Sequence, residues 1–432
     1  MNTSRAPVTA ARPVAQRSTA RFLFAAAVLA TFMTITPADA DASVTTAAAL
    51  REYAREVPPE AAGFSAERFA LVDAAIERAV ADSASPGVAL VVGRYGKIVR
   101  QRGYGRISWH PFAPAVTDST LYDLASLTKA MATSTLAMQL VREGRLDLDR
   151  PIHTYLRSWP GWGAYGRITS RHLLAHTSGL PPGSDMWPGV RTREERIAAL
   201  ARLRVRTTPG ARRVYSDVGM ILLAAVLEDI TGSRLDDLLY MRVLQPLAML
   251  DTRFNPLLPG PEKGPFALAQ IAPTELDTYV RKALVHGVVH DLNAWAMEGV
   301  AGHAGLFSSA RDMAVYGQML LDAAKGQETP VFPAGAFLAW MQRERAFGRP
   351  LGWDVPSGPN SAAGSYFGGS SFGHTGFTGT SIWVDPEHDL FVVLLTNRLN
   401  PSARNRKHIQ LRRDVHDLVQ LAIADARVVR RE

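Results

Sequence analysis

The sequence of 432 residues contains no cysteine, and it has no long hydrophobic run after residue 40. A chain without thiols forms no disulfide bond and offers no cysteine for lipidation. No segment beyond residue 40 reaches the roughly 20 apolar residues that a spanning helix needs. Internal repeats and low-complexity tracts of functional size are also missing. We therefore expect a globular protein without a stable membrane span.

The composition indicates a sizeable core. Hydrophobic residues make up 47% of the chain and charged residues 20%, which suits one large or two ordinary domains. The formal net charge is +8, but the only dense basic run is RNRKHIQLRR at 404–413, within an expected terminal helix. Such a run is typical of a solvated helix face. We expect no nucleic-acid partner.

The first 40 residues differ from the rest of the chain. Arg5, Arg12, Arg17 and Arg21 precede the apolar run FLFAAAVLATFMTI at 22–35, and small residues follow at 38–40. This pattern predicts a cleaved secretory signal over residues 1–40, and hence a periplasmic or secreted protein. Residues 41–60 read as a proline-bearing lead-in, and one hydrolase domain is expected over 61–432.

Periodicity predicts secondary structure mainly at the two ends of this domain. A helix is expected over 65–83 with Ser65 as its N-cap, followed by a hairpin over 87–105. Near the C-terminus, a second hairpin is expected over 381–397 and a helix over 408–426. Between about 145 and 300 the signals are short helices broken by Pro and Gly, with no recognisable strand pair.

This order predicts an α+β fold. We expect an antiparallel sheet built from both ends of the chain, flanked by the N- and C-terminal helices, with a mostly helical lobe inserted at about 145–300. Parallel βαβ units would alternate strands and helices throughout, and this chain does not.

The stretch YDLASLTKAM, at 122–131, places a lysine in a segment that otherwise reads as core. Ser126 and Lys129 are three residues apart at the start of an expected helix that ends at Gly144, so their side chains can touch. Burial and the positive end of the helix dipole both disfavour the ammonium form. A neutral lysine could then act as base toward the hydroxyl. A lone S-x-x-K also occurs by chance in many chains.

Two further motifs follow in order. Tyr215-Ser216-Asp217 opens an apolar helical segment, where Asp217 is at least an N-cap, and Gly373-His374-Thr375-Gly376 leads into a strand. With S-x-x-K, they resemble the serine penicillin-recognising hydrolases, which include class C β-lactamases, D-Ala-D-Ala carboxypeptidases and related esterases and amidases. The resemblance runs from about 65 to 425 and implies the β-lactamase/transpeptidase-like fold. HLLAHTSGLP at 172–181 and GVAGHAGLFSSARDMAVYGQML at 299–320 also resemble this family.

The resemblance implies roles for individual residues. Ser126 would be the nucleophile, Lys129 its base, and Tyr215 the phenol that moves protons to the leaving group and water. The backbone amides of Ser126 and Phe377 would form the oxyanion hole. No metal and no cofactor are implied. The remaining residues expected to contact substrate are His374, Thr375, Gly376 and Asp217.

Two positions depart from the family pattern. Asp217 stands where many relatives carry Asn, and its charge would favour the Lys129 ammonium unless it points away as a cap. His374 stands where β-lactamases usually carry Lys, and a neutral imidazole grips a carboxylate less firmly. Both departures favour an esterase, amidase or peptidase over an efficient β-lactamase. His374 also predicts that anionic substrates bind better at mildly acidic pH.

Two other motifs have alternative readings. Residues 369–373 spell G-x-S-x-G around Ser371, but a nucleophile elbow joins a strand to a helix, and here a strand follows. GWGAYG at 161–166 matches a dinucleotide motif without a βαβ unit, which indicates a loop.

Histidines also occur in pairs four residues apart. His172 and His176 are expected to be structural, with His176 at a helix end. For His286, His290 and Asp291, hydrogen bonds that fix a loop and contact with substrate or metal both stay open.

The sequence thus predicts an exported serine hydrolase that forms an acyl-enzyme on an amide or ester bond. The expected substrate is a peptidoglycan fragment, a D-amino acid peptide or a small carboxylic ester; VHGVVHDLNA at 285–294 suggests the branch acting on cell-wall fragments or related amides. Two alternatives stay open: a slowly acylating penicillin- or peptidoglycan-binding sensor, and a true class C β-lactamase. The oligomeric state is not predicted.

Overall fold

The structure is a computed structural model that describes residues 55–431, except residues 190, 344 and 359. Every described residue falls in the larger of two structural units of the chain, Thr46–Glu432. The predicted signal at 1–40 and most of the predicted lead-in lie outside the described residues.

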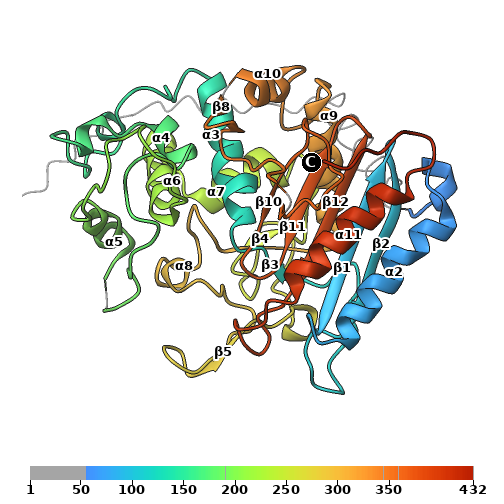
Figure 1. Ribbon diagram of the computed structural model, residues 1–432. Coiled ribbons are helices and arrows are strands. Elements are labelled where there is room, and N and C mark those ends of the chain that lie inside the picture. The colour runs from blue at the N-terminus through green and yellow to red at the C-terminus, as the bar shows by residue number, and fades with distance from the viewer. Residues whose placement is uncertain (1–54, 190, 344, 359, 432) are drawn as a thin grey trace, which may run out of the picture. The chain divides into compact units, whose positions relative to one another are not determined.

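A five-stranded sheet forms the centre of the described unit (Figure 1). Its strand order is β10-β11-β12-β1-β2 and every neighbouring pair is antiparallel. Both predicted hairpins are confirmed, and strands from the two ends of the chain meet where β1 pairs with β12. The strands are β1 (Gly87–Arg94), β2 (Lys97–Gly105), β10 (Phe372–Thr375), β11 (Ser381–Asp385) and β12 (Leu390–Thr396).

Both faces of the sheet are buried because helices cover each of them. Val88, Leu90 and Val92 pack on one face with α2 (Ala66–Ala81) and α11 (His408–Ala422). These two helices lie side by side across the strands in Figure 1. Alternate residues such as Ala89 and Val91 face α9 (Ala310–Ala324) and the larger core. Side chains alternate in a strand, so two covered faces explain the near-continuous apolar runs.

The α+β prediction is confirmed, including the flanking terminal helices. Ser65 caps α2 by accepting the Arg68 amide at 3.3 Å. Helix α11 stops at Ala422, four residues before the predicted end.

The inserted lobe is mostly helical, as predicted, but it also contains short strands that were not predicted. β5 (Leu276–Asp277) pairs with β6 (Ala283–Leu284), and β4 (Arg253–Phe254) joins β7 (Leu306–Ser308) and β3 (Tyr122–Asp123). Strands of two residues show no alternation that a sequence pattern could reveal.

The remaining elements complete the described unit. They are η1 (Pro59–Ala62), η2 (Lys129–Ser134), α3 (Thr135–Arg142), η3 (Ile152–Thr154), η4 (Tyr165–Arg167), α4 (Ser170–Leu174), α5 (Arg193–Leu200), α6 (Asp217–Thr231), α7 (Leu235–Leu239), η5 (Tyr240–Leu244), η6 (Leu268–Gln270), α8 (Leu292–Ala296), α10 (Ala336–Arg343), β8 (Arg345–Ala346) and β9 (Arg349–Pro350). No helix in the described part of the chain combines the length and apolarity needed to cross a bilayer.

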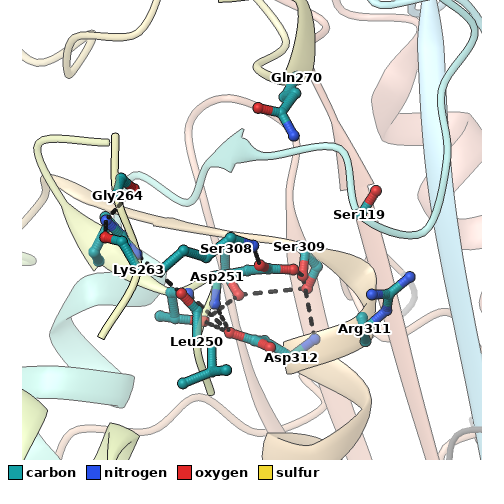
Figure 2. A network of polar contacts seen from close by, with 12 residues as sticks. Ser119, Leu250, Asp251, Lys263, Gly264, Gln270, Ser308, Ser309, Arg311 and Asp312 are labelled. Atoms are coloured by element: carbon teal, nitrogen blue, oxygen red, sulfur yellow. Dashed lines mark hydrogen bonds and ion pairs between the residues drawn. The ribbon is translucent and has the colours of Figure 1, made fainter. Parts of the chain in front are cut away.

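A buried polar network ties the start of α9 to the segment before β4. Asp312 accepts hydrogen bonds at 2.8 Å from the amides of Asp251 and Thr252 and from the Thr252 hydroxyl. Ser309 donates to Asp251 at 2.9 Å, and Lys263 forms an ion pair with the same carboxylate. Figure 2 shows Asp251, Ser309 and Asp312 pointing toward one another. Two carboxylates are thus buried in one network, with one lysine beside them.

Candidate active site

Ser126 lies in a tight turn just after β3. The preceding residue, Ala125, has φ of +47°, a left-handed conformation that a residue with a Cβ rarely adopts. The buried carboxylate of Asp123 accepts the Ala125 amide at 2.8 Å and the His290 amide at 2.7 Å. Asp123 therefore fixes the strained turn and connects it to the loop that carries His290. Such strain persists where surrounding structure enforces it, often at functional sites.

The helix after Ser126 is not a regular α-helix, which corrects our prediction. Residues Lys129–Ser134 form a π-helix, and the α-helix α3 covers only Thr135–Arg142. Short π-segments often occur at functional sites. Lys129 Nζ nevertheless lies 2.7 Å from Ser126 Oγ, so the two side chains are in contact as the motif predicted.

Lys129 is buried, with 1% of its surface exposed, yet its surroundings favour the ammonium form. Burial alone would lower its pKa, but Tyr215 and Asp217 outweigh burial, and the pKa of Lys129 is raised. Nζ has three partners: Ser126 Oγ at 2.7 Å, Asp217 Oδ1 at 2.8 Å and the His303 carbonyl at 2.9 Å. The ammonium donates hydrogen bonds to Ser126 Oγ and to the His303 carbonyl, and it forms an ion pair with Asp217. The expectation of a neutral resting lysine is wrong.

The position of Asp217 explains why the ammonium form of Lys129 is favoured. Ser216, rather than Asp217, caps α6, because its hydroxyl accepts the Gly219 amide at 3.1 Å. The predicted capping role of Asp217 is therefore wrong. Freed from the cap, Asp217 points to Lys129 and holds it as the ammonium.

Tyr215 lies over Lys129 and lines two cavities. Its ring centroid is 5.0 Å from Lys129 Nζ and 4.5 Å from the ring of His176, and the ring of His374 is 6.3 Å away. Tyr215 remains 39% exposed. The phenol therefore adjoins both the lysine and the solvent-filled space where a substrate can bind.

The turn between β10 and β11 packs directly on the Ser126 turn. Thr378 donates to the Asp123 carbonyl at 2.7 Å, and Thr380 donates to the Leu124 carbonyl at 3.1 Å. Gly376 has no room for a side chain, because a Cβ would overlap the Leu124 carbonyl and the Thr380 hydroxyl. These contacts fix the two turns against each other.

The two backbone amides predicted to form the oxyanion hole both belong to these turns. Within the described part of the chain, neither the Ser126 nor the Phe377 amide donates to a protein acceptor. Both residues line the same cavity. Free amides beside a nucleophile can stabilise a developing oxyanion.

Two cavities meet at Tyr215. The larger, about 580 Å³, contains Ser126, Asp217 and Phe377, and its other lining residues include Trp187, Tyr279, Arg281, His290, Asp291 and His303. The smaller, about 280 Å³, shares Tyr215 with it and is lined mainly by His176, Arg213, Arg349, Asp354, His374 and Thr375. Tyr215 thus adjoins both the cavity that contains Ser126 and a second, smaller cavity.

Residues 72–417 match the β-lactamase family. The chain belongs to this family. A protein of Escherichia coli (strain K12) named as a D-alanyl-D-alanine carboxypeptidase is 32% identical over 377 residues, which cover 79% of this chain and 85% of the relative. A Salmonella newport protein with the same name is 30% identical over 388 residues, covering 81% and 87%.

Solved structures of the β-lactamase fold are similar as well. EstCE1, described as a hydrolase with promiscuous acyltransferase activity, superposes with a TM-score of 0.64 at 21% identity and covers 81% of this chain and 99% of its own. SurE with D-Leu gives 0.62 at 24% identity, covering 84% and 78%. A penicillin-binding protein homologue from Pyrococcus abyssi gives 0.58 at 22% identity, covering 79% and 75%. Together with the family match, these findings identify the chain as a β-lactamase-family serine hydrolase.

His374 departs further from the family pattern than the sequence suggested. It lies on the edge strand β10, where burial and the nearby charges of Lys129 and Arg213 lower its pKa to about 3. It therefore stays neutral from pH 5 to 8. The expectation that His374 strengthens anion binding at mildly acidic pH is wrong, because its charged form is too costly in this position.

The histidine pairs do not form a shared metal site. His286 Nε2 contacts the carbonyls of Leu268 and Ile271, at 2.9 and 2.8 Å. His290 instead pairs with Glu275 at 2.9 Å. Among the described residues, no group of three or more histidine or carboxylate side chains is placed to hold a metal ion.

Asp291 contributes to the loop after His290. It caps α8 by accepting the Ala294 amide at 2.8 Å, and it accepts from His303 at the same distance. Burial would raise its pKa, but His303 and the capping bond hold the pKa of Asp291 below its usual range. Asp291 thereby positions His303, whose carbonyl contacts Lys129.

The G-x-S-x-G motif around Ser371 and the glycine-rich segment 161–166 are both consistent with loops. Ser371 is buried and immediately precedes the strand β10, so no strand-to-helix elbow is formed. The segment 161–166 lies in a loop that enters the short helix η4. Neither segment joins Ser126 in the larger cavity.

Sequence analysis missed several residues of the site. Asp123 was visible as a carboxylate within the apolar YDLAS stretch, and that was a usable signal. His176 and His303 lie in segments that resemble the family, but only the fold shows that they reach Tyr215 and Lys129. Arg213, two residues before Tyr215, had no signal in the sequence.

Proposed function

We propose that the protein is an exported serine peptidase or esterase that removes a small carboxylate-bearing group from the end of a peptide. The observation that carries this proposal is the contact of Ser126 Oγ with Lys129 Nζ, at 2.7 Å, in a cavity that also presents two free amides. The names of the relatives support D-alanyl-D-alanine peptides as substrates. Residues 1–40 support export.

The mechanism that we propose proceeds through an acyl-enzyme. Ser126 Oγ attacks the scissile carbonyl carbon, and its proton passes to Lys129 in the fraction of molecules in which Lys129 has lost its own proton. The amides of Ser126 and Phe377 stabilise the oxyanion. When the scissile bond breaks, Tyr215 donates a proton to the leaving nitrogen or oxygen. Water then attacks the acyl-enzyme by the reverse proton path and releases the acid.

The decisive test compares wild type with Ser126→Ala on an acyl-D-alanyl-D-alanine peptide, a chromogenic ester and a cephalosporin. We expect the peptide or the ester to be the best substrate, and the variant to lose at least about 10³-fold in kcat/KM on it. Mass spectrometry of the wild type should detect an acyl adduct on the peptide containing Ser126. Full activity of the variant would refute the proposal.

The same experiment separates two other functions. A single burst of acylation without steady product would indicate a sensor. A cephalosporin turned over faster than the peptide would indicate a true class C β-lactamase.

A further inference from the structure

The smaller cavity beside Tyr215 contains an unpaired cation. Its lining includes two arginines, and Arg349 forms an ion pair with Asp354. Arg213 is half-buried and, within the described part of the chain, makes no ion pair or hydrogen bond. Burial lowers the pKa of Arg213, and Tyr215 offsets this effect only in part. An arginine without an acceptor in a cavity favours an anionic ligand.

His374 cannot supply this anion site. Its Nδ1 lies 3.0 Å from the Thr375 carbonyl, which can only accept, so Nδ1 carries the ring proton. In the neutral ring, Nε2 then has a lone pair and no proton to offer a carboxylate. The position where the family pattern expects a cation therefore holds an acceptor in this chain.

The two cavities have opposite charge. The larger cavity, which contains Ser126, is lined by carboxylates that outnumber its one arginine, Arg281: Asp185, Asp217, Glu275, Asp277 and Asp291. The smaller cavity has Arg213 as an uncompensated charge. An anionic group is therefore favoured in the smaller cavity, beside Arg213, and disfavoured in the larger cavity, which contains Ser126.

We propose that Arg213 binds the carboxylate of the leaving group and thereby selects substrates that end in a free carboxylate. This inference rests on the proposed function, in which Tyr215 protonates the leaving atom, because Tyr215 also lines the smaller cavity and a leaving group next to it can occupy that cavity. At about 280 Å³, that cavity suits one small amino acid or hydroxy acid. Arg213 is a specificity-determining residue that takes the place of the strand residue His374.

The test uses two substrates that differ in one group, acyl-D-alanyl-D-lactate and the corresponding lactamide. We expect wild type to prefer the carboxylate, and Arg213→Gln to lower kcat/KM for it roughly 10- to 100-fold, mainly through KM. The neutral lactamide should change less than about threefold. Arg213→Lys should keep part of the preference. Arg212→Gln, an exposed neighbour with the same charge change, should behave as wild type.

Two outcomes would overturn the inference: an equal loss on both substrates, or an unchanged preference in Arg213→Gln. A pH series adds an independent criterion. The groups that titrate or carry charge around this cavity are His176, Arg213, Tyr215, Arg349, Asp354 and His374. Burial lowers the pKa of both histidines to about 3, so the preference should be flat from pH 5 to 8. A steep rise on acidification would assign the anion site to a histidine instead.

A binding measurement keeps this test separate from the proposed function. Acetyl-D-alanine and its amide are titrated by calorimetry into Ser126→Ala protein, with Arg213 or with Arg213→Gln. We expect only the protein with Arg213 to prefer the acid. If Ser126→Ala kept full hydrolytic activity, the proposed function would fail, while the acid-to-amide ratio would still decide the role of Arg213.

Discussion

Lys129 defines the chemistry of the site through its protonation state. Its ammonium donates two hydrogen bonds and forms an ion pair with Asp217, which explains how a charge can lie almost completely buried. In this protonated form Lys129 cannot act as a base, because a fully protonated lysine cannot take a proton from Ser126. Activity should therefore rise with pH through the pKa of Lys129, and Asp217 should set where that rise occurs.

Replacing Asp217 with Asn tests this relation. Asp217 raises the pKa of Lys129, so its neutral replacement should lower that pKa and move the acidic limb of the pH profile to lower pH. An opposite charge at this distance shifts a pKa by roughly one unit or more. The measurement is kcat/KM against pH on a neutral ester. The control is Asp185→Asn, which changes an exposed carboxylate of the same cavity. Its acidic limb should lie within about 0.3 pH unit of the wild-type limb.

Either a limb that stays in place in Asp217→Asn or one that moves to higher pH would contradict this account. In that event, a group other than Lys129 would limit activity at low pH.

At the scale of elements, the site depends on the contact between two turns. The Ser126 turn and the turn between β10 and β11 are joined by hydroxyl-to-carbonyl hydrogen bonds from Thr378 and Thr380. The two free amides lie one on each turn. Their spacing therefore depends on how closely the turns approach, and Gly376 permits that approach.

We expect Gly376→Ala to separate the turns. The added Cβ would overlap the Leu124 carbonyl, so the Phe377 amide should move away from Ser126. Loss of one oxyanion donor lowers kcat by roughly 10²- to 10³-fold, and the overlap should cost about 1 to 3 kcal/mol of stability. Steady-state kinetics and thermal unfolding measure the two effects. Gly369→Ala has open space around its Cβ and should change neither.

The kinetic effect should also appear in molecules that remain folded. If Gly376→Ala retained full kcat after correction for its folded fraction, the amide of Phe377 would not be part of the oxyanion hole.

At the scale of the whole molecule, the buried network around Asp312 couples the fold to pH. Burial and the neighbouring charge of Asp251 raise the pKa of Asp312 to about 7. An unfolded aspartic acid has a pKa of about 3.9, so between these values the folded state binds the additional proton. Asp312 therefore stabilises the fold at low pH, and this contribution is lost as pH rises through about 7.

Asp312→Asn should remove this dependence. As pH rises from about 4 to 7, the titration of Asp312 should lower the free energy of unfolding of the wild type. The slope should reach about 1.4 kcal/mol per pH unit. The difference in denaturant stability between wild type and variant should therefore change with pH in that window. Glu387→Gln, at an exposed carboxylate, should keep the wild-type slope. Parallel curves for wild type and Asp312→Asn would rule out this titration.

Much of the fold followed from local pattern. Apolar runs around turn residues in 87–105 and 381–397 predicted both hairpins, and helical periodicity with Ser65 as cap predicted α2. The contact between Ser126 and Lys129 followed from spacing, even though the helix has π geometry rather than α geometry. The two-residue strands were missed because such short pairings depend on the partner segment and not on a periodic sequence.

The sequence by itself determined the order of elements and the residue types at the reacting centre, because period and spacing are local properties. Only the tertiary structure decided which of these groups carry charge. Asp217 holds Lys129 as an ammonium, burial keeps His374 neutral, and Arg213 is left unpaired beside them. A pKa depends on distance, burial and neighbouring charge, and these arise only when segments remote in sequence pack together.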